Sequence, residues 1–191
     1  MAVWYLMRGT GVVSLVLLTG VFALGIATQR RARIPTLPRF ATLALHRSLS
    51  LLAVTFIAIH VVTALVDPYA AVTVVDLLVP FTASSQPLWI GLGALALDLV
   101  LALIVTGLLR RRIGRRAFRA VHWGAYAAWP LALVHAIGIG SDTATPWLRW
   151  VGVACVLVVA AGAAWRWGAR PAQTTRASQS RTAPTTSVSP P

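Results

Sequence analysis

The sequence contains no lysine, no glutamate, a single cysteine and only four acidic residues, all of them aspartate. Charged residues make up 11% of the 191 residues, whereas soluble domains carry about a quarter. So few charges could not cover a surface that faces water, and one cysteine cannot build a disulfide scaffold. The lack of a glycine repeat and of a sustained heptad excludes collagen and coiled coils. An integral membrane protein remains.

Apolar residues account for 58% of the chain and gather in five long runs. The runs cover residues 11–28, 41–66, 88–109, 120–139 and 147–167. Each is close to the length of about 20 residues that a helix needs to cross a bilayer. We therefore predict an all-α, multi-pass protein of the cell membrane, built as a bundle of five transmembrane helices. The first run has no clear small-residue cleavage site, so we expect a retained helix rather than a signal peptide.

The seventeen arginines are distributed unevenly between the two sides of the predicted bundle. One side receives Arg30, Arg31, Arg33, Arg39, Arg47, Arg110, Arg111, Arg112, Arg115, Arg116, Arg119, Arg166, Arg170, Arg176 and Arg181. The other side receives Arg8 and Arg149, together with Asp67, Asp76 and Asp142. Because arginine accumulates in cytoplasmic loops, we predict an outside amino terminus and a cytoplasmic carboxyl terminus. Nucleic-acid binding is disfavoured, since the arginines lie between apolar runs rather than along one soluble face.

We expect residues 1–170 to form the membrane domain and residues 171–191 a disordered cytoplasmic tail. The tail is rich in proline, serine and threonine, and has no apolar period from which to build a core. Residues 67–87 form a long outer loop with an apolar middle at 71–81, which is too short to span. That middle should lie on the membrane surface or fold over the bundle.

All four histidines fall inside predicted helices. His46 and His60 share the second helix and lie 14 residues apart, and His122 and His135 share the fourth and lie 13 apart. At 1.5 Å per residue these separations are about 21 Å and 20 Å. One crossing separates the two helices, so they run parallel. His46 and His122 should therefore share the inner depth, and His60 and His135 the outer depth.

Two facing imidazoles at each of two depths suit two six-coordinate haems stacked across the membrane. No Cys-x-x-Cys-His is present, so the haems would be noncovalent, b-type groups. Fourteen residues return to within about 40° of the starting direction, so His46 and His60 should share a helix face. Thirteen residues miss by about 140°, which places His122 and His135 apart on an ideal helix. A kink at Pro130 would have to absorb that mismatch.

Other interpretations stay open. An intramembrane histidine can serve only as a hydrogen-bonding residue between helices, although ionisable groups there are costly and tend to be functional. The alternative function is a non-redox transporter or ion pathway that uses the histidines as proton or metal sites. Arg47 and Arg119 could pair with haem propionates or only fix the orientation. Asp98 could hydrogen-bond to a neighbouring helix, carry protons or contact a quinone.

The histidine spacing, the outer stretch DPYAAVTVVDLLVPF, and the segments PLWIGLG and RAVHWGAYAAWPLALVH resemble the ferric reductase-like transmembrane domain over about residues 10–168. NADPH oxidases, ferric-chelate reductases and the haem subunit of bacterial methionine sulfoxide reductase systems share that domain. The resemblance implies two b haems that pass electrons across the membrane. Their ligands would be His46, His60, His122 and His135.

The larger enzymes of that group continue into domains that bind FAD and NAD(P)H. No G-x-G-x-x-G follows a strand in this sequence. We therefore expect an oxidoreductase component that takes electrons from a separate cytoplasmic flavoprotein reductase or from quinol.

Overall fold

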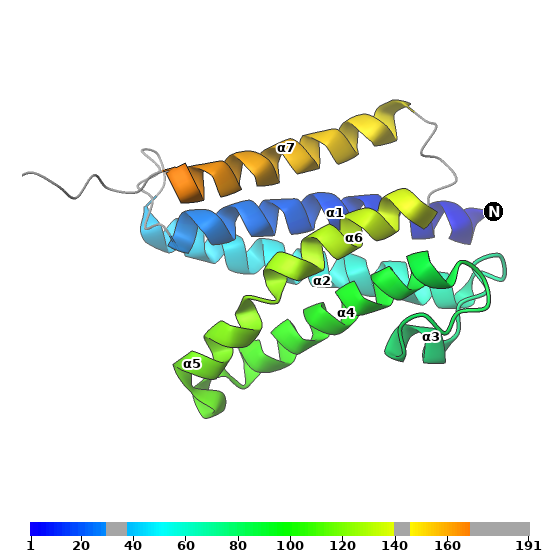
Figure 1. The fold of residues 1–191 in the computed structure, drawn as a ribbon, viewed down its shortest axis with the longest axis horizontal. Coiled ribbons are helices and arrows are strands. Elements are labelled where there is room, and N and C mark those ends of the chain that lie inside the picture. The colour runs from blue at the N-terminus through cyan, green and yellow to red at the C-terminus, as the bar shows by residue number, and fades with distance from the viewer. Residues whose placement is uncertain (30–37, 140–145, 169–191) are drawn as a thin grey trace, which may run out of the picture.

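The computed structural model describes residues 1–29, 38–139 and 146–168. These residues form seven helices and no strand. Figure 1 shows how the helices are arranged. The helices are α1 (Ala2–Gln29), α2 (Arg39–Val66), α3 (Val74–Leu78), α4 (Pro87–Leu108), α5 (Arg110–His122), α6 (Ala125–Ile139) and α7 (Pro146–Gly168). The predicted tail at 171–191, and the arginines and aspartate assigned to residues 30–37 and 140–145, lie outside the described residues.

Four of these helices, α1, α2, α4 and α7, are long and apolar enough to cross a membrane, and α6 is a shorter apolar helix. The protein is therefore a multi-pass integral membrane protein with an all-helical fold. The four long helices correspond to four of the five predicted runs. Helix α1 starts earlier than predicted, because the segment before residue 11 is also apolar apart from Arg8. Arg8 belongs to this helix, and its guanidinium lies over the Trp4 ring, 4.6 Å from the ring centroid.

The fourth predicted run is divided between two helices. The prediction of a loop over the arginines before it was wrong, since they belong to α5, which is interrupted only at Gly114, where φ is 78°. A second interruption falls at Trp123 and Gly124, where the Gly124 N–H donates to the Val121 carbonyl at 2.7 Å. A Cβ on Gly124 would lie 2.9 Å from that oxygen, so the tight turn requires glycine. Pro130 lies within α6, after this turn. The break in the helix between His122 and His135 therefore falls at Trp123 and Gly124.

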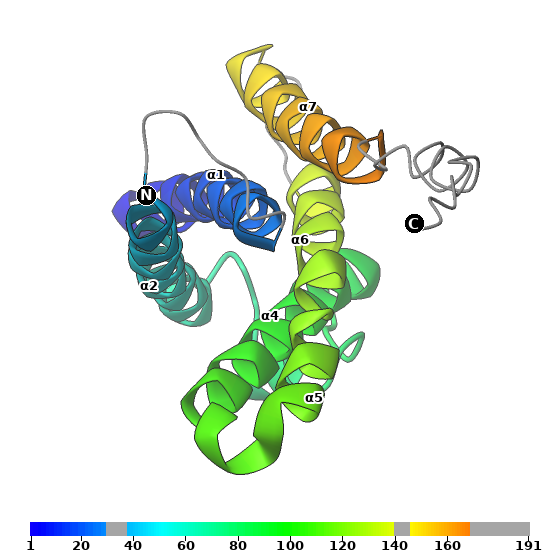
Figure 2. The same ribbon diagram turned by 90° about the vertical axis from the view of Figure 1, so that its left-hand side faces the viewer.

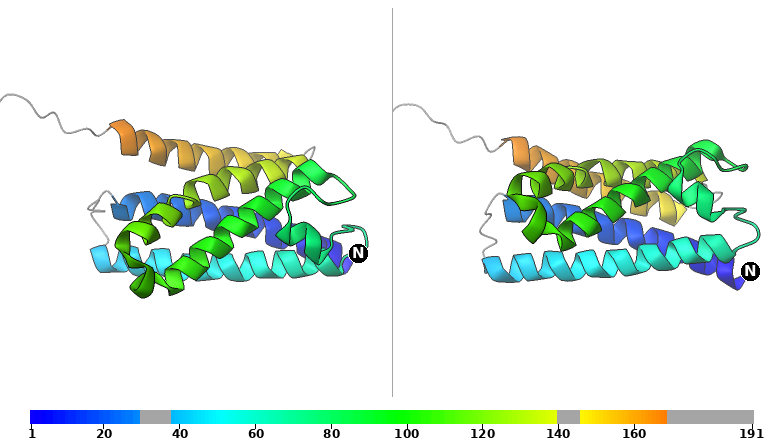
Figure 3. Two further views of the ribbon diagram at one scale, coloured as in Figure 1. Left: turned by 60° about the horizontal axis from the view of Figure 1, so that its bottom comes forward. Right: turned by 90° about the horizontal axis from the view of Figure 1, so that it is seen from below.

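Helix α1 pairs with α2, and α4 pairs with α6, in both cases antiparallel (Figures 2 and 3). Helix α1 also packs against α6 and α7. Among the described helices, α2 packs closely only against α1. The core lies where α1, α6 and α7 meet and contains Leu15, Trp129, Leu133 and Cys155. There the Trp129 indole N–H donates to the Thr19 hydroxyl at 2.9 Å, which ties α6 to α1.

The outer segment between α2 and α4 folds over one end of the bundle. Asp76 accepts hydrogen bonds from the backbone N–H and hydroxyl of Thr73 and from the hydroxyl of Thr82. The Thr73 bonds hold the pKa of the Asp76 carboxyl below its ordinary value. The Phe81 ring lies against Gly91 of α4, where a Cβ would come within 2.2 Å of it. The segment thus packs against α4, as expected of a placement over the bundle, while its apolar residues Val74, Val75 and Leu78 stay exposed.

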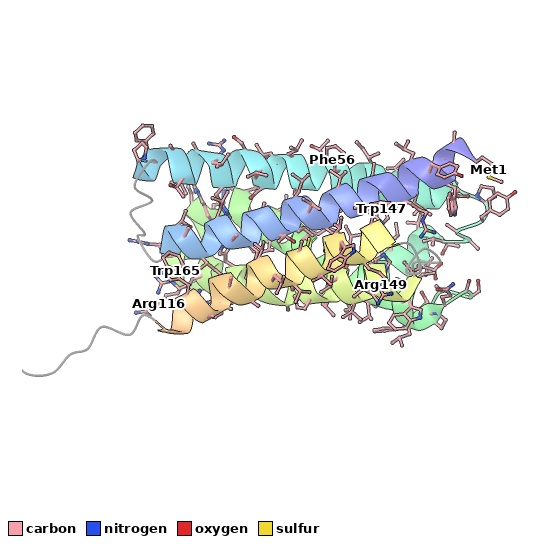
Figure 4. The ribbon with its side chains drawn as sticks, turned by 90° about the horizontal axis from the view of Figure 1, so that it is seen from above. Met1, Phe56, Arg116, Trp147, Arg149 and Trp165 are labelled. Atoms are coloured by element: carbon pink, nitrogen blue, oxygen red, sulfur yellow. The ribbon has the colours of Figure 1, made fainter. Side chains whose placement is uncertain are left out.

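The two ends of the bundle differ in character. Figure 4 shows Arg116 and Trp165 at one end, and Met1, Trp147 and Arg149 at the other. All six arginines of α5 are exposed at the first end: Arg110, Arg111, Arg112, Arg115, Arg116 and Arg119. We call this the arginine-rich end, and the opposite one, which carries α3, the α3 end.

Candidate functional site

The structure brings His60 of α2 and His135 of α6 together near the α3 end. Their ring centroids are 6.4 Å apart and their planes are inclined at 77°. The backbones of α2 and α6 are not in close packing with each other. The two side chains therefore reach toward one another across the space between the helix pairs, at the shared depth that the histidine spacing predicts.

His60 lies against a single turn of α1. Its Nδ1 is 2.8 Å from the Met7 carbonyl oxygen. A carbonyl only accepts, so Nδ1 carries the proton and Nε2 keeps a free lone pair. The ring reaches this carbonyl because residue 11 is glycine: a Cβ there would lie 3.0 Å from Cε1 and 3.1 Å from Nδ1. On a helix, the side chain at i+4 lies on the face of residue i, so a glycine at i+4 uncovers the carbonyl of residue i.

His135 lies against an equivalent turn of α4. Its Nδ1 donates to the Trp89 carbonyl at 2.8 Å, and a Cβ on Gly93 would lie 2.6 Å from the same nitrogen. Trp89 and Gly93 are again residues i and i+4. We call such a turn, with a carbonyl acceptor at i and a glycine at i+4, a histidine-binding turn. Both outer histidines are thus held as the same tautomer by the same local device.

A second contact interlocks α4 with α6 at this level. The Trp89 indole lies directly over Gly138, where a Cβ would be 1.9 Å from the ring. Each helix therefore supplies one ring and one glycine: His135 packs over Gly93, and Trp89 packs over Gly138. Trp89 is not free to act as the lipid-facing anchor expected of a tryptophan near a helix end. Trp147 and Trp150 are exposed and fit that role.

His46 faces a third turn of this kind on α1, with looser contacts. A Cβ on Gly25 would lie 3.6 Å from His46 Cε1, and the backbone of Val21, four residues before Gly25, interacts with the ring. However, His46 Nδ1 is buried without a regular hydrogen bond to any described residue. His46 and His60 both face α1, as their 14-residue spacing predicts.

His122 is the last residue of α5 and is half-buried. Its ring stacks with Phe118, with centroids 5.3 Å apart and planes at 21°. His122 is close enough to His46 for an electrostatic interaction. Within the described part of the chain, the two rings make no contact like that of the outer pair. The structure therefore assembles the outer pair more completely than the inner pair.

The other candidate residues occupy simpler surroundings. Arg47 and Arg119 are exposed, beside His46 in sequence and three residues before His122. Asp98 is half-buried in the middle of α4 and makes no hydrogen bond to a described residue, so the expected bond to a neighbouring helix is not found. Arg166 has a role beyond orientation: its guanidinium lies over the rings of Trp123 and Tyr126, at 5.1 Å and 5.2 Å, next to the break before α6.

The glycines of the histidine-binding turns escape a search for ligating side chains, although their spacing carries a signal. Gly11 and Gly25 on α1 are 14 residues apart, and so are Gly93 and Gly107 on α4. The same interval separates His46 from His60. Equal intervals on antiparallel neighbours are what two stacked layers of contacts require.

A family model described as the ferric reductase like transmembrane component matches residues 10–133. The match extends from α1 into α6 and includes His46, His60 and His122, and His135 lies two residues beyond it. No curated protein and no solved structure matches the chain.

Proposed function

Because the chain belongs to the family of ferric reductase-like transmembrane components, we propose that it carries electrons across the membrane through two b-type haems. Family membership makes the protein a transmembrane redox module. His60 and His135 would hold the outer haem, and His46 and His122 the inner one. The observation that carries the proposal is the outer pair, whose ring centroids are 6.4 Å apart and whose Nδ1 protons are both committed to backbone carbonyls.

The outer pair fits an iron ligated from two sides. Bonds of about 2 Å between a metal and each imidazole nitrogen place two ring centroids roughly 6 Å apart. The centroids of His60 and His135 are separated by 6.4 Å. Donation of Nδ1–H to a carbonyl fixes the ring and increases the basicity of the ligating nitrogen, as is usual for metal-bound histidine. The chain itself thus prepares both Nε2 atoms for ligation.

The two histidine depths suit transfer through the apolar layer. A bound haem supplies a one-electron redox couple. Along α2, His46 and His60 are about 21 Å apart at 1.5 Å per residue, most of a hydrocarbon layer of about 30 Å. Arg47 and Arg119 lie at the inner depth, where arginine would pair with propionate carboxylates.

We assign the arginine-rich end to the cytoplasm and the α3 end to the outside. The exposed arginines of α5 support this orientation, because arginine accumulates on the cytoplasmic side of membrane proteins. The same end is where a separate cytoplasmic flavoprotein reductase would meet the inner haem, since a basic surface attracts an acidic partner. Quinol in the membrane is the other candidate donor.

Cysteine labelling should test this orientation. In a Cys155→Ala background, a membrane-impermeant maleimide added to intact cells should label Ser84→Cys, in the outer segment, but not Arg112→Cys in α5. Both native positions are exposed, so reagent access differs only by the side of the membrane. Permeabilised cells, where both variants should react, provide the control. Labelling of Arg112→Cys alone in intact cells would invert the orientation.

The purified protein, expressed with ample haem, should show a b-type absorption spectrum that dithionite reduces, with two haems per chain. NADPH alone should leave the haems oxidised, because the electron donor is a separate partner. Haem content and difference spectra measure both points. A chain that remains without haem would defeat the electron-transfer proposal and favour the non-redox alternative, and rapid reduction by NADPH alone would remove the need for a partner.

A further inference from the structure

Helix α4 carries a fourth turn with the composition of a histidine-binding turn, formed by the Leu103 carbonyl and Gly107. It repeats the turn of Trp89 and Gly93 at an interval of 14 residues. Helix α1 contains two such turns at the same interval, and each faces a histidine of α2. Three glycine turns therefore contact a histidine, and the turn at Gly107 lies 14 residues after one of them on the same helix.

The fourth turn has no histidine against it in this structure. A Cβ on Gly107 would meet nothing within 4 Å. The residue expected opposite it can be read from the antiparallel arrangement of α4 with α6. His135 lies over Gly93. Because α4 and α6 are antiparallel, moving 14 residues along α4 from Gly93 to Gly107 corresponds to moving about 14 residues back along the chain from His135. That step ends next to His122, whose ring stacks on Phe118 instead.

The backbone around His122 is built to allow a change of direction. Residues 115–122 form a helical segment between two non-helical points, Gly114 with φ of 78° on one side and the turn at Trp123 and Gly124 on the other. Because both ends of this short segment are non-helical, it can rotate and move His122 without bending α4 or α6. Helix α5 packs against α4, the helix that carries the fourth turn.

We propose that His122 occupies the fourth turn when the inner haem is bound, with its Nδ1–H donated to the Leu103 carbonyl and its ring over Gly107. This inference rests on the proposed function. The Leu103 carbonyl accepts a long hydrogen bond from the Thr106 hydroxyl at 3.3 Å. The Met7 carbonyl accepts a similar bond from the Thr10 hydroxyl at 3.0 Å and still holds His60, so such a bond leaves room for a histidine. His122 then has the same tautomer as His60 and His135, and its ring is held by a backbone carbonyl in the same way. Leu103 and Gly107 are positioning residues, since they act on the haem through His122.

Valine substitution at Gly107 tests this assignment against a matched control. Gly107 and Gly152 both lie in apolar membrane-spanning helices, and in both cases a Cβ would meet nothing within 4 Å. The contacts in this structure alone therefore predict that both variants behave like the wild type. Our inference predicts that Gly107→Val loses the inner haem, or shifts its redox potential and electron paramagnetic resonance signal, whereas Gly152→Val retains both haems unchanged. His46→Ala identifies which signals belong to the inner haem.

The outer haem of the same sample reports whether Gly107→Val is folded. If that variant does not accumulate, Gly107→Ala should retain two haems with an altered inner potential. A wild type with two haems and a Gly107 variant with an unchanged inner signal and potential would overturn the assignment of the fourth turn while leaving the proposed function intact. A wild type that binds no haem would overturn the proposed function itself, and the assignment with it.

Discussion

Alanine at His60 or at His135 is expected to remove one and the same haem, and alanine at His46 or His122 to remove the other. Each variant should fall from two haems per chain to one, because each depth supplies one ligand from α2 and one from α5 or α6. The prediction is stronger for the outer haem, because the ring centroids of His60 and His135 are already 6.4 Å apart. Haem-to-protein stoichiometry with redox titration measures the outcome.

Trp129→Phe provides a control for these variants, since it alters a buried aromatic residue that faces neither histidine pair and should retain both haems. Removal of the same centre by His46→Ala and His135→Ala would contradict the pairing. Complete loss of haem in all four variants would show that the two depths do not fill independently.

Gly93→Val should abolish the outer haem while the inner one remains. A Cβ at this position would lie 2.6 Å from His135 Nδ1, so the ring must withdraw and give up its bond to the Trp89 carbonyl. Loss of such a supporting partner typically costs a metal site about 10- to 100-fold in affinity, and displacement of the ligand itself costs more. Gly11→Val should act on the same haem from the other side, through His60. Haem titration of the apoprotein measures the affinity.

Helix α1 offers a close control for the second variant. Gly9 lies two residues from Gly11 in the same helix, and a Cβ there would meet nothing within 4 Å. Gly9→Val should therefore bind both haems with wild-type affinity. If Gly9→Val and Gly11→Val weakened haem binding equally, the effect would come from the helix as a whole and not from contact with His60.

Features that depend on one helix or on composition were predictable from the sequence. The depth of each histidine follows from the rise of a helix, and the common face of His46 and His60 from its period. The meeting of His60 with His135 needed only the parallel course of their helices. By contrast, the helical state of α5 was hidden because arginine lowers hydropathy yet is a good helix former. A run of arginines therefore looks like a loop to any test that counts apolar residues.

Features that depend on contacts between helices were not predictable. The break at Trp123 and Gly124 reflects a backbone approach that leaves no room for a Cβ, which no local pattern distinguishes from an ordinary helical glycine. From its place near a helix end, Trp89 is expected to lie at the membrane–water interface, whereas in the structure its ring packs over Gly138. The 14-residue interval between Gly11 and Gly25 was present in the sequence, but only their contacts with His60 and His46 explain it.

Among the described helices, α2 packs closely only against α1. The lifetime of the folded chain would therefore depend on the supply of haem. A ligand that binds only the folded state adds a stabilisation of RT ln(1 + [L]/Kd), and here that term would act chiefly on α2. Two bonds to iron, through His46 and His60, would fasten this helix to α5 and α6, which carry His122 and His135 and with which its backbone is not closely packed. In a cell short of haem, α2 is then the helix that membrane proteases and chaperones meet first, and degradation would remove modules that cannot conduct electrons.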